Sequence, residues 1–410
     1  MGRQNIHSKV IKAIKKRSVF MEKTRPRSAS FKLALLSISL MLQSGGTIAI
    51  AVSKMKETFV DHSATAVESL VTAPNITIMI FVLLSTFLVR SLGTKTVVLL
   101  GLTIAGISGM VPMITENYTI VYLSRLALGA GLGMYNSLAV SLIDYFYEGE
   151  LRNKMLGYQT AFQSLGQMIM TFLASQLAVI SWQYAYIVYG LALVPVVLFL
   201  FFIPTIHTKT EGDEKDKGTI KINPFTILST LGFFFTFAFI MNLYTKATTF
   251  VLEANFSNAE FLGTALSLAT IVAFICNFLY GNIVKYTKHY TMPISYLILG
   301  ISFFLISNSS SMFSLTVAIF LASAGAALYT PYSFGILMQK APRNAANLAV
   351  SIGMVGVNLG VFFSPYIMSA ISNFFTNQSA AFSMLSSGYV FTGFALITFF
   401  FSKQLRVSEN

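Results

Sequence analysis

The sequence predicts an all-α membrane protein whose twelve transmembrane helices form two pseudo-symmetric bundles of six. Apolar segments of spanning length recur between residues 33 and 402, and a helix needs roughly 20 apolar residues to cross a bilayer. The chain is 55% hydrophobic and only 10% charged. Its apolar segments are continuous rather than alternating, which argues against a β-barrel. The expected spans are 33–53, 66–89, 96–114, 119–142, 155–179, 184–204, 226–249, 261–284, 291–308, 313–337, 345–371 and 382–402.

The polar stretch Thr208–Asn223 lies between the sixth and seventh spans and divides the chain into two halves. We expect a basic N-terminal segment (1–32), a first bundle (33–204), a linker (205–224), a second bundle (225–402) and a short tail (403–410). Similar residues recur at offsets of 192 to 195 positions, which indicates an internal repeat. The matching pairs are Arg90 with Lys285, Gly131 with Gly325, Gly166 with Gly360, and Lys54 with Lys246.

The net charge of +13 is distributed unevenly along the chain. If the N-terminus is cytoplasmic, 24 of the 28 Lys and Arg residues fall on the cytoplasmic side. This positive-inside bias predicts a multi-pass plasma-membrane protein with both termini in the cytoplasm, and no binding of nucleic acid. The basic N-terminal segment fits either an amphipathic helix on the membrane surface or a disordered tail. Met21 is an alternative translation start.

Several classes of chemistry are not expected. The single cysteine, Cys276, lies inside a predicted span, so an intramolecular disulfide is impossible. The four histidines lack the spacing of metal ligands. No phosphate-binding Gly-rich loop is followed by Lys and Ser or Thr, which excludes ATP-driven transport by this chain. We therefore expect no enzyme activity, no cofactor and no metal, and a monomer surrounded by membrane lipids.

The turn between the second and third spans carries a recognisable pattern. In one large family this turn reads Gly-x-x-x-Asp-Arg-x-Gly-Arg-Lys. Residues 86–95 keep Gly93 and Lys95 of that pattern, but Thr86 replaces the first glycine and Arg90 replaces the aspartate.

Two further motifs follow in the same order as in that family. Arg125, Gly129 and Gly131 match an Arg-x-x-x-Gly-x-Gly pattern in the fourth span, and residues 182–186 are similar to the Trp-Arg-x-x-Phe that opens the sixth span. With these motifs and its layout of six plus six spans, the chain resembles the major facilitator superfamily over residues 31–402.

The resemblance implies a secondary transporter that carries a small-molecule substrate by alternating access. We expect proton-coupled export of an organic compound, of the drug or metabolite efflux type. Uptake of an organic anion is the alternative, and a non-transporting membrane sensor on the same scaffold is a third possibility. The first span contains no acidic residue, which favours neutral or anionic substrates.

An ionisable side chain within a span is costly and therefore a candidate functional group. The resemblance associates Arg125 with proton coupling. We expect Arg125 to face the central cavity and to bind an anionic group or tune a carboxylate, whereas a structural arginine is the alternative. Glu68 is its candidate partner, although an exposed acid at a loop end is slightly favoured. Lys246 could line the cavity, but snorkelling to the interface is favoured.

Uncharged polar residues inside the spans complete the candidate substrate pathway. They are Gln43 in the first span, Gln163 in the fifth, Asn242 in the seventh and Asn358 in the eleventh.

The cytoplasmic turns predict a gate. With Arg90 in place of the aspartate, we expect Arg90 to pair with Asp144 or Glu148 as a charge-reversed latch, and an ordinary positive-inside role is the alternative. The gate candidates are Thr86, Arg90, Gly93, Lys95, Asp144, Glu148, Gly281 and Lys285.

Overall fold

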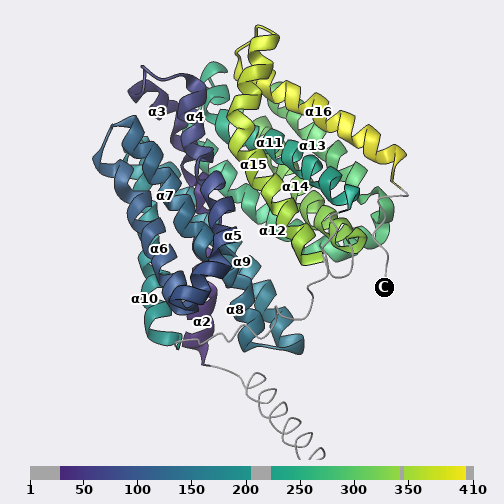
Figure 1. Ribbon diagram of the computed structural model, residues 1–410. Helices are drawn as coiled ribbons and strands as arrows, with labels where there is room; N and C mark the ends of the chain where they lie inside the picture. The colour runs from purple at the N-terminus through teal and green to yellow at the C-terminus, as the bar shows by residue number, and fades with distance from the viewer. Residues whose placement is uncertain (1–27, 205–222, 342–345, 403–410) are drawn as a thin grey trace, which may run out of the picture.

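The computed structural model describes residues 28–204, 223–341 and 346–402, and these residues form helices without strands (Figure 1). The predictions made for the N-terminal segment, Met21, most of the linker and the C-terminal tail lie outside the described residues. The helices separate into a first bundle, drawn purple to teal, and a second bundle, drawn teal-green to yellow.

The first bundle runs from Ala29 to Phe202. Its elements are α2 (Ala29–Ser37), the 3-10 segments η1 (Ile38–Met41) and η2 (Ser44–Ala51), α3 (Val52–Thr58), α4 (Ala64–Thr72), α5 (Pro74–Leu92), α6 (Thr94–Met110), η3 (Val111–Ile114), α7 (Tyr118–Asn136), α8 (Leu138–Phe146), α9 (Gly149–Ile180), η4 (Tyr184–Ala192) and α10 (Leu193–Phe202).

The second bundle runs from Pro224 to Phe400. Its elements are α11 (Pro224–Glu253), η5 (Ala259–Phe261), α12 (Leu262–Thr287), η6 (Lys288–Tyr290), α13 (Thr291–Ser307), α14 (Met312–Lys340), α15 (Ala346–Phe374) and α16 (Ala380–Phe400). Helix starts in both bundles are fixed by residues whose side chains accept a backbone N–H of the first turn. These caps are Ser28, Ser63, Asn117, Asn223, Ser311 and Ser379.

The helix count agrees with the predicted twelve spans. In the described part of the chain, ten helices are long and apolar enough to cross a membrane, and the bent pair Ala29–Met41 and Ser44–Thr58 makes an eleventh. One of the ten, Ala259–Ser307, contains both α12 and α13. These two helices are separated at Lys288, whose φ of +48° ends α12. Counting them separately gives twelve.

We call the two ends of the molecule the distal face and the terminal face. The distal face carries the connections 59–63, 115–117, 254–258 and 375–379, and lies at the top of Figure 1. The terminal face carries the start of α2, the end of α10, the start of α11 and the end of α16.

The internal repeat appears in the packing of both bundles. A Cβ at Gly166 would collide with the backbone of Leu40, and a Cβ at Gly360 would collide with the backbone of Phe234. Gly360 follows Gly166 by 194 positions, and Phe234 follows Leu40 by the same number. Close approach of backbones at small residues is how helices associate in a membrane. The two bundles therefore repeat the same crossing between their first and fifth helices.

The bundles contact each other on the distal side. There α9 packs against α12, while α4 and α5 pack against α15. Helix α12 is buried mainly over Leu262–Ala269, and none of its residues from 271 to 287 is buried. The bundles therefore close against each other at the distal face and diverge towards the terminal face.

Replacing glycine by alanine at a helix crossing and at an open position distinguishes the effect of packing on stability from the effect of helix propensity. We expect Gly166→Ala to lower the melting temperature, because the new Cβ meets the backbone of Leu40. Gly232→Ala is the control, since a Cβ at Gly232 meets nothing within 4 Å. It should leave stability unchanged or raise it by up to about 1 kcal/mol. Equal effects of the two substitutions in thermal unfolding of the detergent-purified protein would contradict this packing.

Candidate functional site

A cavity of about 460 Å³ lies between the two bundles. Its lining is rich in hydroxyl and amide side chains, and among the described lining residues none is charged. The first bundle contributes Gln43, Thr160, Gln163, Ser164 and Gln167, and the second bundle contributes Tyr244, Thr270, Asn277, Ser323 and Thr330.

Gln43 reaches the cavity because the first span is broken beside it. The helix axis bends by 47° between Met41 and Ser44, and Gln43 has φ −100° and ψ 10°, outside the helical region. Its side chain is exposed, whereas Leu42 and Ser44 on either side of it are buried. The break therefore directs the side chain of Gln43 into the cavity, although its neighbours in the span are buried.

The polar residues of α9 share one helical face. Thr160, Gln163, Ser164 and Gln167 follow the spacing i, i+3, i+4 and i+7, which places them on one side of an α-helix. All four line the cavity. A volume of this size is in the range of small-molecule sites, which typically occupy 300–1,000 Å³. Donors and acceptors from both bundles fit a neutral, hydrogen-bonding solute.

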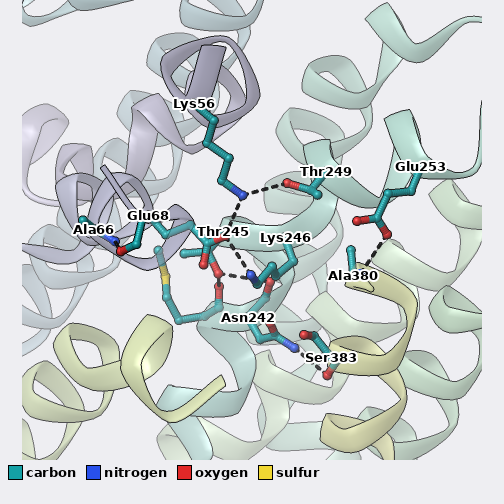
Figure 2. Close-up of polar contacts among 12 residues, drawn as sticks. Lys56, Ala66, Glu68, Asn242, Thr245, Lys246, Thr249, Glu253, Ala380 and Ser383 are labelled. Atoms are coloured by element: carbon teal, nitrogen blue, oxygen red, sulfur yellow. Dashed lines mark hydrogen bonds and ion pairs between the residues drawn. The ribbon is translucent and has the colours of Figure 1, made fainter. Parts of the chain in front are cut away.

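Glu68 links the bundles on the distal side of this cavity. Its side chain is fully buried on α4, and its Oε1 accepts hydrogen bonds from Lys56 Nζ and Lys246 Nζ, both at 2.7 Å (Figure 2). Lys56 also donates to Thr249 Oγ1 at 3.2 Å. Lys56 and Glu68 belong to the first bundle, while Lys246 and Thr249 belong to α11. We call this contact the Glu68 bridge.

A second polar contact joins the bundles near the bridge. Thr72 Oγ1, one turn after Glu68 on α4, donates to the carbonyl oxygen of Phe362 on α15 at 3.2 Å. Glu68 Oε2 has no hydrogen-bond partner among the described residues. The bridge thus concentrates two cations on one oxygen of a buried carboxylate.

The favoured sequence interpretations of Glu68 and Lys246 were wrong. Glu68 is not an exposed loop-end acid, because it lies in the middle of α4, which packs against α3, η2 and α15, and its side chain is fully buried. Lys246 does not snorkel to an interface; it reaches Glu68 in the other bundle. Its repeat partner Lys54 behaves differently, since its Nζ donates to the carbonyls of Ala178 and Val179 at the end of α9. The repeat conserves the position of the cation but not its partner.

Arg125 is also fully buried, but it does not line this cavity. Nε donates to the carbonyl oxygen of Leu70 at 2.9 Å, one terminal nitrogen donates to Tyr189 Oη at 2.7 Å, and the other donates to the carbonyl oxygen of Gly45. The guanidinium carbon lies 5.4 Å from the Tyr189 ring centroid and 5.9 Å from that of Tyr186. The expected partner Glu68 is bound by lysines instead.

The two asparagines expected in the pathway make hydrogen bonds within the second bundle. Asn242 is fully buried, and its Nδ2 donates to Ser383 O at 2.7 Å and Ser387 Oγ at 2.9 Å on α16 (Figure 2). Asn358 Nδ2 donates to the carbonyl of Met354 one turn earlier on α15. Neither is among the residues that line this cavity.

Gln43 and Gln163 do line the cavity, but sequence reasoning missed its second-bundle wall. Thr270 and Asn277 are seven positions apart on α12, two helical turns, so they face the same way. That polar spacing within an apolar segment was the available signal. Ser323 and Thr330 repeat it on α14.

On the terminal face, Asp144 Oδ1 accepts a hydrogen bond from Arg152 Nε at 2.7 Å. This hydrogen bond, together with the charge of Asp144, raises the pKa of Arg152 above its ordinary value. Pairing of Arg90 with Asp144 or Glu148 stays a prediction.

The remaining gate candidates lie at a turn, donate to a backbone carbonyl or are exposed. Gly93 has a φ of +81° and connects α5 to α6, so a side chain there would be strained. Lys95 Nζ donates to the carbonyl oxygen of Leu200. Thr86, Gly281 and Lys285 are exposed.

Two helical bundles that repeat the same helix crossing, with a polar cavity between them, define a polytopic membrane protein of the transporter type. The chain matches the family described as Major Facilitator Superfamily over residues 33–288 and 247–409. It belongs to that family. A comparison with curated protein sequences gave no match.

Solved structures share the fold. A mutant of the nucleoside transporter NupG has a TM-score of 0.73 and 14% identity, covering 92% of this chain and 100% of its own. The inward-open xylose transporter XylE from E. coli has a TM-score of 0.72 and 15% identity over 90% of this chain and 95% of its own. An auto-inhibited peptide transporter of the POT family scores 0.72 at 13% identity over 94% and 98%. At these identities the likeness shows the fold alone.

The Glu68 bridge predicts a non-additive mutant cycle. Lys246→Met leaves Glu68 paired with Lys56, so its cost should be small. Replacing both lysines strands a buried carboxylate, which typically costs about 3–5 kcal/mol. The loss of melting temperature in the double variant should therefore be well above the sum of the losses in the two single variants. Adding Glu68→Gln to the double variant should restore part of that loss.

Glu253→Gln is the matched control for this cycle. Glu253 lies on α11, as Lys246 does, but its Oε2 accepts a hydrogen bond from the backbone N–H of Ala380 within the second bundle (Figure 2). It should not rescue the double lysine variant. Additive losses of melting temperature for the two lysines would contradict the bridge.

Proposed function

We propose that this protein is a secondary transporter that moves a neutral, polar organic solute through the central cavity by alternating access. The observation that carries the proposal is the lining of that cavity, which draws uncharged hydrogen-bonding side chains from both bundles. A solute held between two bundles is transferred when the bundles rock about it.

The terminal face is proposed to be cytoplasmic, as the distribution of Lys and Arg predicts. With that orientation, a molecule closed at the distal face and diverging at the terminal face is in an inward-facing state of a plasma-membrane monomer. Opening the distal face would separate α11 from α3 and α4. Lys246 would then have to leave Glu68, so the bridge sets part of the energy difference between the two states.

The charges around the cavity support a neutral substrate over the alternatives. Uptake of an organic anion would use Arg125 and Lys246 as anchors, but Arg125 is bound by carbonyl and phenol oxygens and Lys246 is bound by Glu68. A cationic compound would find no carboxylate among the described lining residues. A neutral solute needs neither. Nucleosides and sugars, which the named structural neighbours NupG and XylE carry, are of this kind.

We further propose that transport is coupled to protons in the direction of export, with Glu68 as the group that exchanges the proton. In the closed distal face its Oε1 holds two ammonium groups. Once α11 moves away, Glu68 loses one of these cations, and a proton from outside water can take its place. As the distal face closes, Lys246 would pair with Glu68 again and displace this proton towards the cavity and the terminal side. A non-transporting sensor would need no such coupling.

Ligand-induced stabilisation tests the substrate class. A ligand at a hundred times its Kd adds about 2.7 kcal/mol to the stability of the folded state. We expect neutral nucleosides or sugars to raise the melting temperature of the purified protein. Gln43→Ala and Gln163→Ala should abolish the shift, whereas Asn358→Ala should not. Stabilisation by organic anions alone, insensitive to both glutamines, would contradict the proposal.

Proton coupling is tested with Glu68→Gln in proteoliposomes loaded with the stabilising solute. The variant cannot exchange a proton at this site, so solute movement driven by a pH gradient should be lost. Counterflow of labelled against unlabelled solute at equal pH should persist, since this exchange needs only that the loaded cavity open alternately to the two sides. If gradient-driven movement survives in Glu68→Gln, another group carries the proton.

A further inference from the structure

The first span is interrupted in the middle of the protein. Two 3-10 segments, Ile38–Met41 and Ser44–Ala51, flank Leu42 and Gln43, and the axis bends by 47° there. Irregular backbone at membrane depth is tolerated only where its freed polar groups find partners. The break therefore needs donors from outside its own helix.

Two residues supply donors to consecutive carbonyls directly after Gln43. Tyr189 Oη donates to the carbonyl oxygen of Ser44 at 2.9 Å, and Arg125 donates to the carbonyl oxygen of Gly45. Arg125 also donates to Tyr189 Oη at 2.7 Å, so the two side chains form one connected network. The donors come from α7 and η4, and they hold the span on the side away from the cavity.

The charge of Arg125 has no carboxylate partner among the described residues. Its three hydrogen bonds go to two carbonyls and one phenol, and two aromatic rings lie against the guanidinium. A guanidinium offers five donors in a fixed planar fork, which a lysine cannot reproduce. Only a fork can reach Leu70 on α4, Gly45 on η2 and Tyr189 on η4 together.

The position of Arg125 is itself fixed by close helix packing. One turn after it, a Cβ at Gly129 would collide with the carbonyl of Pro74, where α5 begins. This glycine lets α7 approach the junction of α4 and α5, and so brings Arg125 within reach of the Leu70 carbonyl.

We infer that Arg125 is a positioning residue that holds the broken first span in the shape that presents Gln43 to the cavity. The inference rests on the proposed function, because it takes the cavity as the substrate site. Arg125 acts here through backbone carbonyls and touches neither solute nor proton.

The test measures where residue 43 points, without any substrate. In a Cys276→Ala background, Gln43→Cys is reacted with a charged, membrane-impermeant methanethiosulfonate reagent, and the labelling rate is followed by mass spectrometry. Gln167→Cys and Thr330→Cys, on helices that Arg125 does not contact, are the matched controls. All three cysteines should label in the otherwise unchanged protein.

Arg125→Met should slow labelling at residue 43 by roughly tenfold or more, because loss of a charge-assisted hydrogen bond releases the carbonyl of Gly45 and the span regularises. Labelling at 167 and 330 should not change. Arg125→Lys should behave like Arg125→Met, since a single ammonium cannot reach all three acceptors. If charge alone mattered, the lysine would restore labelling.

Unchanged labelling at residue 43 in Arg125→Met, with the controls still reactive, would overturn the inference and leave the proposed function intact. Controls that do not react even with Arg125 present would instead overturn the proposed cavity, and the inference with it. If Arg125→Met does not fold, Tyr189→Phe removes the donor to Ser44 and one partner of Arg125. That variant should slow labelling at residue 43 by a few fold, and an unchanged rate would again overturn the inference.

Discussion

The contact of Glu68 with two lysines is the constraint on which the arrangement of the two bundles depends. A carboxylate with no exposed surface is stable only when its charge is matched, and Glu68 takes one cation from its own bundle and one from the other. Lys56 keeps the carboxylate paired whatever the second bundle does. On the proposed mechanism, Lys246 separates from Glu68 and returns to it in each cycle.

The charged groups inside the spans serve the scaffold and leave the cavity neutral. Arg125 donates hydrogen bonds to a carbonyl of the broken first span and to Tyr189, and Lys246 donates to Glu68. The space between the bundles is then left to amides and hydroxyls such as Gln43 and Gln163. A site of this kind recognises a solute by the direction of its hydrogen bonds, which a rigid helical wall can fix.

Much of the fold could be predicted from the sequence, because span length and helix crossings leave local signals. Gly166 and Gly360 mark equivalent crossings, and Gln43 and Gln163 mark the cavity as polar residues in apolar spans. The burial of Glu68 could not be predicted, since it depends on α4 and α11 meeting across the interface. The role of Arg125 was hidden for a different reason: its acceptors are mainly backbone carbonyls, which every residue carries.

Distances between spin labels on the two faces test the central claim, that the Glu68 bridge holds the distal face closed. In a cysteine-free background, nitroxides at Val60→Cys and Phe374→Cys report the distal face, and those at Phe87→Cys and Tyr286→Cys report the terminal side. All four positions are exposed. Glu68→Gln should lengthen the distal distance and shorten the terminal one in double electron–electron resonance. Unchanged distributions for both pairs would contradict the account.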